Sequence, residues 1–170
     1  MENLNKVSKF FLFLCTLSFI LWSGTYFSKF LLMYQFYEPE MTLRPIFNNV
    51  DFTAIFYTIS SVFGFNIMFY PIFLVTLVLF FVTSKLSLKK EGWFFIIFVF
   101  TFISAPFEIY SLTYDYKIVN MIFGGNYAND TILSLIKEKI ISLGSFPFVQ
   151  FAFIAAISFL AIFKPLRKVK

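Results

Sequence analysis

The chain has 170 residues, of which 59% are hydrophobic, and its 14 Lys and Arg residues outnumber its 9 Asp and Glu residues. A mean hydropathy of +0.82 is well above that of a soluble domain, so we expect one all-α membrane domain over residues 1–170, with phenylalanine (29 residues) facing lipid. The lack of histidine excludes histidine-ligated haem and most zinc sites, and a single cysteine, Cys15, excludes an intramolecular disulfide.

The first predicted element is an apolar helix over about residues 10–32, roughly 34 Å long. It follows a short basic segment, as the apolar core of a signal peptide also would. Its hydrophobicity continues past Ser23 and Gly24, however, where a signal peptide would already have ended. We therefore expect a retained membrane helix, with cleavage as the alternative.

The second predicted span covers about residues 52–82 and is too long for one straight crossing, so we expect it to tilt or bend near Pro71. Ser60 and Gly64 have the spacing of two small residues that let a neighbouring helix approach closely. Asn66 is expected near the middle of the membrane, where its amide more often bonds another helix than a substrate.

The third predicted span, about residues 93–114, carries the most informative pattern in the chain. Polar residues recur along it at steps of three and four, which places them on one face of a helix: Thr101, Ser104, Glu108, Ser111 and Asp115. An ionisable residue inside a membrane span marks a functional site by default. Glu108 is therefore the leading candidate for such a site.

The connection that follows is predicted to contain a short amphipathic helix over about residues 130–143. Its apolar face consists of Ile132, Ile136, Ile140 and Leu143, whereas the charged residues 137–139 are expected elsewhere. We expect this helix to lie on the bilayer surface or across the mouth of the bundle.

The fourth predicted span covers about residues 146–163. Ala152 and Ala156 repeat the spacing of two small residues, and Gln150 is the only strongly polar side chain in this span. The sequence thus predicts a bundle of four transmembrane helices with one amphipathic helix between the third and fourth.

Four crossings place both termini on one side of the membrane. That side, with the basic turn at residues 84–92, carries nine Lys and Arg residues against two Glu residues, whereas the opposite connections carry four cations against six carboxylates. Because cytoplasmic loops are enriched in Lys and Arg, we expect a bacterial inner-membrane protein with both termini in the cytoplasm. The net charge is then a topology signal and gives no support to nucleic-acid binding.

Lys29 and Glu108 are predicted to meet. Counted from the expected membrane boundary, each lies toward the non-cytoplasmic side, and either charge alone would be costly in lipid. The alternative is that Lys29 extends to the lipid headgroups and that Glu108 is protonated.

The sequence contains no pattern typical of a catalytic, metal or cofactor site, so we expect no enzyme and no cofactor. The first functional hypothesis is a structural or accessory subunit that binds other membrane proteins. The alternative is a small transporter in which Glu108 binds a proton or cation and other polar residues line the path. That intramembrane site would include Lys29, Asn66, Thr101, Ser104 and Gln150.

Overall fold

The computed structural model describes residues 4–86, 91–125 and 127–166, and within them the fold is all-helical. The five α-helices are α1 (Lys6–Tyr34), α2 (Thr53–Ser84), α3 (Gly92–Gly124), α4 (Asn129–Leu143) and α5 (Phe146–Phe163). A 3-10 helix, η1 (Pro45–Phe47), lies in the connection between α1 and α2. Part of the predicted basic turn and most of the basic C-terminal segment lie outside the described residues.

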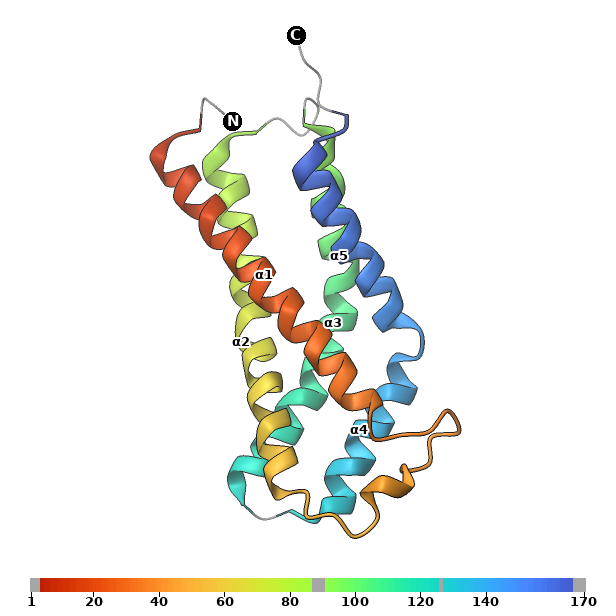
Figure 1. The fold of residues 1–170 in the computed structure, drawn as a ribbon. Helices are drawn as coiled ribbons and strands as arrows, with labels where there is room; N and C mark the ends of the chain where they lie inside the picture. Colours follow the sequence, from red (N-terminus) through yellow and green to blue (C-terminus); the bar gives the residue numbers. More distant parts are fainter. Residues whose placement is uncertain (1–3, 87–90, 126, 167–170) are drawn as a thin grey trace.

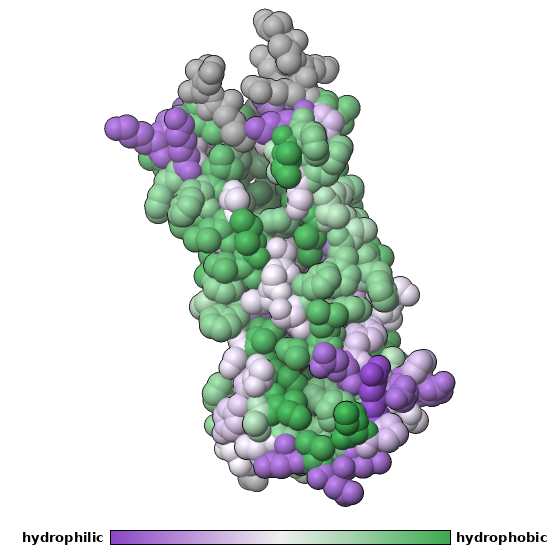
Figure 2. Space-filling model, in the orientation of Figure 1, coloured by the Kyte–Doolittle hydropathy of each residue, from purple (hydrophilic) through white to green (hydrophobic). Residues whose placement is uncertain are grey.

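Four of these helices, α1, α2, α3 and α5, are long and apolar enough to cross a membrane. Helix α1 begins and α5 ends at the same end of the bundle (Figure 1), which we call the terminal end. On the face shown in Figure 2 the middle of the bundle is mostly hydrophobic, and hydrophilic residues gather near its two ends. This arrangement agrees with the predicted number of spans.

The helices form two pairs. Helix α1 packs along α2, α5 packs along α3, and contacts between α2 and α3 join the pairs. Toward the terminal end α1 and α5 diverge (Figure 1), whereas α2 and α3 stay in contact there through Phe80, Phe81 and Phe94. The opposite end, which we call the far end, is filled by α4 and by the connection between α1 and α2.

Helix α3 is longer than the sequence predicted. Its predicted end was about residue 114, but the helix continues to Gly124. It can do so because Asp115 is fully buried and paired, and because Ile118 and Ile122 beyond it are buried in the core. With 33 residues, α3 is about 50 Å long, well beyond the roughly 30 Å of a bilayer's hydrocarbon core.

A helix is present at the position of the predicted amphipathic helix, but it is oriented differently. Helix α4 runs lengthwise beside α3 and leads into α5 (Figure 1), instead of lying across the mouth. Its Ile132, Ile136 and Ile140 are buried against Phe56 and Phe63 of α2 and neighbouring residues. Because this apolar face is covered by the rest of the chain, α4 belongs to the packed end of the bundle.

The connection between α1 and α2 folds onto α4. Phe36, Tyr37 and Phe52 are buried there, and the Tyr37 hydroxyl donates a 2.5 Å hydrogen bond to the Leu133 carbonyl of α4. Burial raises the pKa of Tyr37 to about 12, so this phenol keeps its proton at neutral pH and remains a donor. The far end therefore has a core of its own.

The four small residues predicted to pack against neighbouring helices differ in burial. A side chain added at Gly64 would meet no atom within 4 Å, and Ala152 is exposed. Ser60 is buried and donates to the Tyr57 carbonyl of its own helix, and Ala156 is half-buried. Gly64 and Ala152 thus lie on the outside of the bundle.

Candidate functional site

Five buried polar side chains from four helices meet in the far half of the bundle. We call this group the ion cluster: Lys29 of α1, Asn66 of α2, Glu108 and Asp115 of α3, and Lys139 of α4. None of the five residues exposes more than 3% of its surface. With two lysines and two carboxylates, the cluster has no net charge when all four groups are ionised.

Lys29 is the centre of the cluster. Its Nζ atom donates to Asn66 Oδ1 at 2.7 Å, to Asp115 Oδ2 at 3.1 Å and to Glu108 Oε1 at 3.4 Å. It also lies 4.9 Å from the centroid of the Tyr26 ring, close enough for a cation–π contact. The predicted contact between Lys29 and Glu108 is therefore present, and Lys29 does not extend to the surface.

Asn66 holds α1 and α2 together, as predicted for an amide that bonds another helix. Its Oδ1 atom accepts a hydrogen bond from Lys29 Nζ, and its Nδ2 atom donates to Thr25 Oγ1 at 3.3 Å. Both partners lie on α1, so the amide makes a second contact with the helix that carries the central lysine.

Lys139 joins the cluster from α4, where its Nζ atom donates to Asp115 Oδ1 and lies 5.0 Å from the centroid of the Phe63 ring. Burial lowers the pKa of Lys139 to about 8, and its nearness to Lys29 acts in the same direction. The carboxylates of Asp115 and Glu108 oppose this shift only in part. The pKa of Lys139 is therefore well below the usual value for a lysine.

The sequence indicated part of this cluster and missed the rest. All five residues of the polar stripe on α3 are buried, as the spacing predicted. Lys139, however, was expected among solvated charges, and Asp115 was counted in a connection. The missed signal was periodicity, because Lys139 lies three residues after Ile136 and seven after Ile132, on the same face of α4.

The other predicted site residues are buried but do not belong to the ion cluster. Ser104 donates to the Thr101 carbonyl at 3.1 Å, which ties it to its own helix. Thr101 Oγ1 and Gln150 Oε1 are buried and have no hydrogen-bond partner among the residues that the structure describes. The structure thus brings together Lys29, Asn66 and Glu108 of the predicted site, and not Gln150, Ser104 or Thr101.

Glu108 has one unused oxygen. Its Oε1 atom accepts from Lys29, whereas Oε2 is buried and has no partner in the described part of the chain. Such an atom can accept a proton or a hydrogen bond. Tyr70 OH and Trp22 Nε1 of the neighbouring helices are likewise buried and unpartnered.

The cluster is not built as a metal site. Within residues 4–86, 91–125 and 127–166, no three side chains of His, Cys, Asp or Glu come together in a way that could hold a metal ion. Both carboxylates of the cluster instead contact lysine ammonium groups.

Comparisons of the chain with protein-family models, curated proteins and solved structures found no match.

Proposed function

We propose that this protein is a non-catalytic accessory subunit that lies in the membrane and binds a larger membrane-protein assembly. The closed ion cluster is the observation that supports this function best. Both carboxylates and both lysines are paired with one another and shielded from the surface. A neutral, enclosed cluster of this kind fixes the positions of helices and presents no reactive group to a substrate.

The physical role of the cluster follows from the free energy that it costs to bury charged groups. Transferring an isolated charge out of water costs several kcal/mol, and pairing within a low-dielectric interior offsets much of that cost. The pairing is possible only when α1, α3 and α4 have one relative rotation and depth. The cluster would therefore select one arrangement of the bundle, and so give a partner a defined surface to bind.

The surface that would bind the partner is the outside of α2 and α5. Gly64 on α2 and Ala152 on α5 leave open space beside their helices, which a helix of another protein can approach closely. In the proposed orientation both termini face the cytoplasm of a bacterial cell, in agreement with the excess of Lys and Arg at the terminal end.

Purification of the tagged full-length chain in a gentle detergent tests this function. We expect a second membrane protein to copurify at a fixed stoichiometry and to be lost from the Gly64→Leu variant. The thermal stability of that variant should not fall, because a β-carbon added at Gly64 has no atom of a neighbouring helix within 4 Å. Gly24→Leu is the matched control, since Gly24 also has open space around it but lies on α1. Recovery of a lone monomer or homodimer would contradict the proposal.

A second candidate function, proton-dependent transport, is favoured by the unpartnered Oε2 atom of Glu108. Protonation there would weaken the contact with Lys29 and change the charge of the cluster by one. The test is proton flux into liposomes that contain the purified protein and a pH-sensitive dye. Under this alternative Glu108→Gln abolishes the flux without unfolding the protein, and Glu40→Gln, at an exposed carboxylate, leaves it intact.

A further inference from the structure

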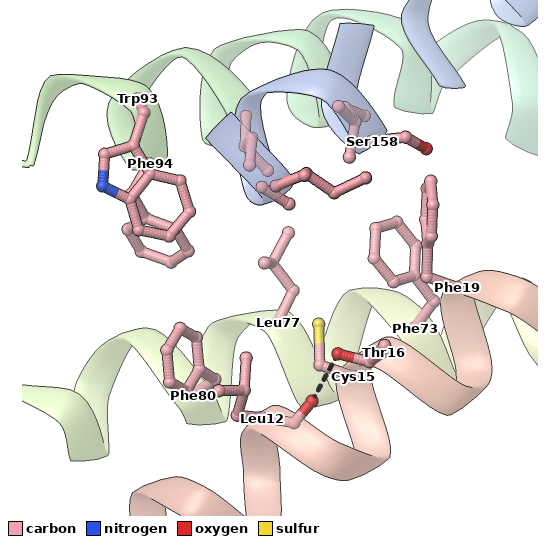
Figure 3. Close-up of a pocket in the computed structure, with 14 residues that line it drawn as sticks. Leu12, Cys15, Thr16, Phe19, Phe73, Leu77, Phe80, Trp93, Phe94 and Ser158 are labelled. Carbon is pink, nitrogen blue, oxygen red and sulfur yellow. Dashed lines mark hydrogen bonds between the residues drawn. The ribbon is translucent and has the colours of Figure 1, made fainter. Parts of the chain in front are cut away.

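An apolar cavity of about 300 Å³ lies among α1, α2, α3 and α5 in the terminal half of the bundle. Figure 3 shows Leu77 of α2 on one side of it and Trp93 of α3 on the other. Thr16 and Ser158, whose hydroxyl groups line it, each donate to a carbonyl of their own helix, at 2.9 and 2.8 Å. This cavity therefore offers a ligand no free hydroxyl group.

A second, much smaller cavity adjoins the ion cluster and has polar walls. Its volume is about 20 Å³, and it lies where α1, α3 and α4 meet the beginning of α5. Its lining includes Tyr26 and Lys29 of α1, Ser111 of α3 and Lys139 of α4. Each of these four residues exposes no more than 3% of its surface. The polar atoms around this cavity are therefore shielded from bulk water.

The two lysines in this wall differ in the number of acceptors that they have. An ammonium group carries three N–H donors. Lys29 has an acceptor for each of them, one amide oxygen and two carboxylate oxygens. Lys139 has one acceptor within the described part of the chain, Asp115 Oδ1. Two N–H donors of a fully buried ammonium group are thus left without a protein acceptor.

Two hydroxyl groups of the same wall are also unused. Ser111 and Tyr26 make no hydrogen bond within residues 4–86, 91–125 and 127–166. A serine in a helix can bond a carbonyl of the preceding turn, as Ser104 does with Thr101 at 3.1 Å. Ser111 does not, although it lies on the same face of α3. Its hydroxyl group is therefore available to an occupant of the cavity.

The missing acceptor must be small and neutral. A buried N–H group without an acceptor is costly, and more so when it carries charge. A water molecule needs a cavity of about 10–15 Å³ and two to four polar partners, so a cavity of about 20 Å³ holds one water and no larger ligand. The cluster has no net charge when its four groups are ionised, so it does not require an additional ion.

We propose that this cavity binds one water molecule, which accepts a hydrogen bond from Lys139 and links it to the hydroxyl groups of Ser111 and Tyr26. The bound water joins α4 to α3 and α1 at a point where these side chains do not bond one another directly. It also distinguishes the two lysines, because Lys29 is bonded by protein atoms alone and Lys139 is hydrated. The proposal does not rest on the accessory-subunit function.

Nuclear magnetic resonance of the lysine ammonium groups tests the proposal. The full-length chain, with nitrogen-15 in its lysine side chains, is studied in detergent micelles at pH 6, where Lys139 carries its proton. The Lys139→Arg variant keeps the charge and identifies the Lys139 signal by its loss. We expect a rotating-frame Overhauser cross-peak between the Lys139 ammonium protons and water, with the sign of a bound neighbour and not that of chemical exchange.

A pair of variants on α3 locates the water. Ser111→Thr keeps the hydroxyl group but adds a methyl group to the cavity wall, so the cross-peak should be lost. Ser104→Thr is the matched control, because Ser104 is buried on the same helix but does not line this cavity, and the cross-peak should remain. If Ser111→Thr does not fold, Leu143→Phe fills the cavity from α4, with Ile141→Phe as its exposed control.

Each outcome decides for or against the bound water. A cross-peak that is present in the parent and lost only when the cavity is filled supports the proposal. A parent protein without the cross-peak, or with an exchange peak alone, would overturn it. A cross-peak that persists in the filled variant would place the water on another side of Lys139 and would overturn it too. Because no second protein takes part, these results are independent of whether a partner subunit binds.

Discussion

Lys29 and Glu108 lie 79 positions apart in the sequence, yet the Lys29 Nζ and Glu108 Oε1 atoms are 3.4 Å apart inside the bundle. The same ammonium group is closer to Asp115 Oδ2, at 3.1 Å. Lys29 therefore compensates two carboxylates at once, and Lys139 shares one of them. This sharing determines what substitutions in the cluster should do.

Removal of Lys29 should be among the most destabilising changes in the protein. We expect Lys29→Met to lower the free energy of unfolding by about 3–5 kcal/mol, because it leaves Glu108 buried without a counter-charge. Adding Glu108→Gln should recover part of that loss, and thermal unfolding in detergent measures both. Neutral substitutions test this contact better than an exchange of the two charges, because Lys29→Glu would place a second carboxylate beside Asp115. Additive losses in the double variant would show that the two groups do not interact.

The control for the Lys29→Met substitution is Lys9→Met. Lys9 is an exposed lysine on the same helix, and its replacement should change the stability by no more than about 0.5 kcal/mol.

Lys139 should give the protein a pH-dependent stability. Its pKa is about 8 in the fold and close to 10.5 when the chain is unfolded, so between these values the unfolded state holds the additional proton. Stability should therefore rise with pH across this window, by at most about 1.4 kcal/mol per pH unit. The Lys139→Met variant lacks this contribution. The stability of the parent minus that of the variant should grow from pH 8 to pH 10.5, and a constant difference would contradict the lowered pKa.

The buried face of α4 should contribute strongly to stability. Ile136 is fully buried against α2 and α3, so Ile136→Ala should cost about 2–5 kcal/mol through lost burial and the cavity left behind. Ile141 is 58% exposed on the same helix, and Ile141→Ala should cost about 0.5 kcal/mol or less. Chemical denaturation of the two variants compares them directly. Equal losses would mean that α4 is not packed as the structure describes.

The two ends of the bundle should lie on opposite sides of the membrane. In a Cys15→Ala background, a cysteine at exposed Asn48 is expected to react with a membrane-impermeant thiol reagent on intact cells. A cysteine at exposed Asn5 should react only after permeabilisation. This expectation follows from the excess of Lys and Arg at the terminal end. The reverse labelling pattern would place the termini outside.

Local sequence patterns determined the number of long helices and the buried face of α3. Four apolar runs long enough to span a bilayer are visible in the sequence, and the steps of three and four between Thr101 and Asp115 follow directly from helical geometry. The contact between Lys29 and Glu108 was also predictable. Counting the helical rise from the expected boundary placed both toward the same side of the membrane.

Only the tertiary structure decided which further charged residues join Lys29 and Glu108 in the ion cluster. In the sequence Asp115 continues the polar stripe one position beyond the predicted end of its span, and Lys139 belongs to a charged group that was expected away from the apolar face of its helix. Folding α4 against α3 brings these two opposite charges together, so α3 can continue as a buried helix beyond residue 114. The cavity beside Leu77 and Trp93 likewise has no local signal. It arises because α1 and α5 diverge, and the angle between helices depends on the packing of many side chains at once.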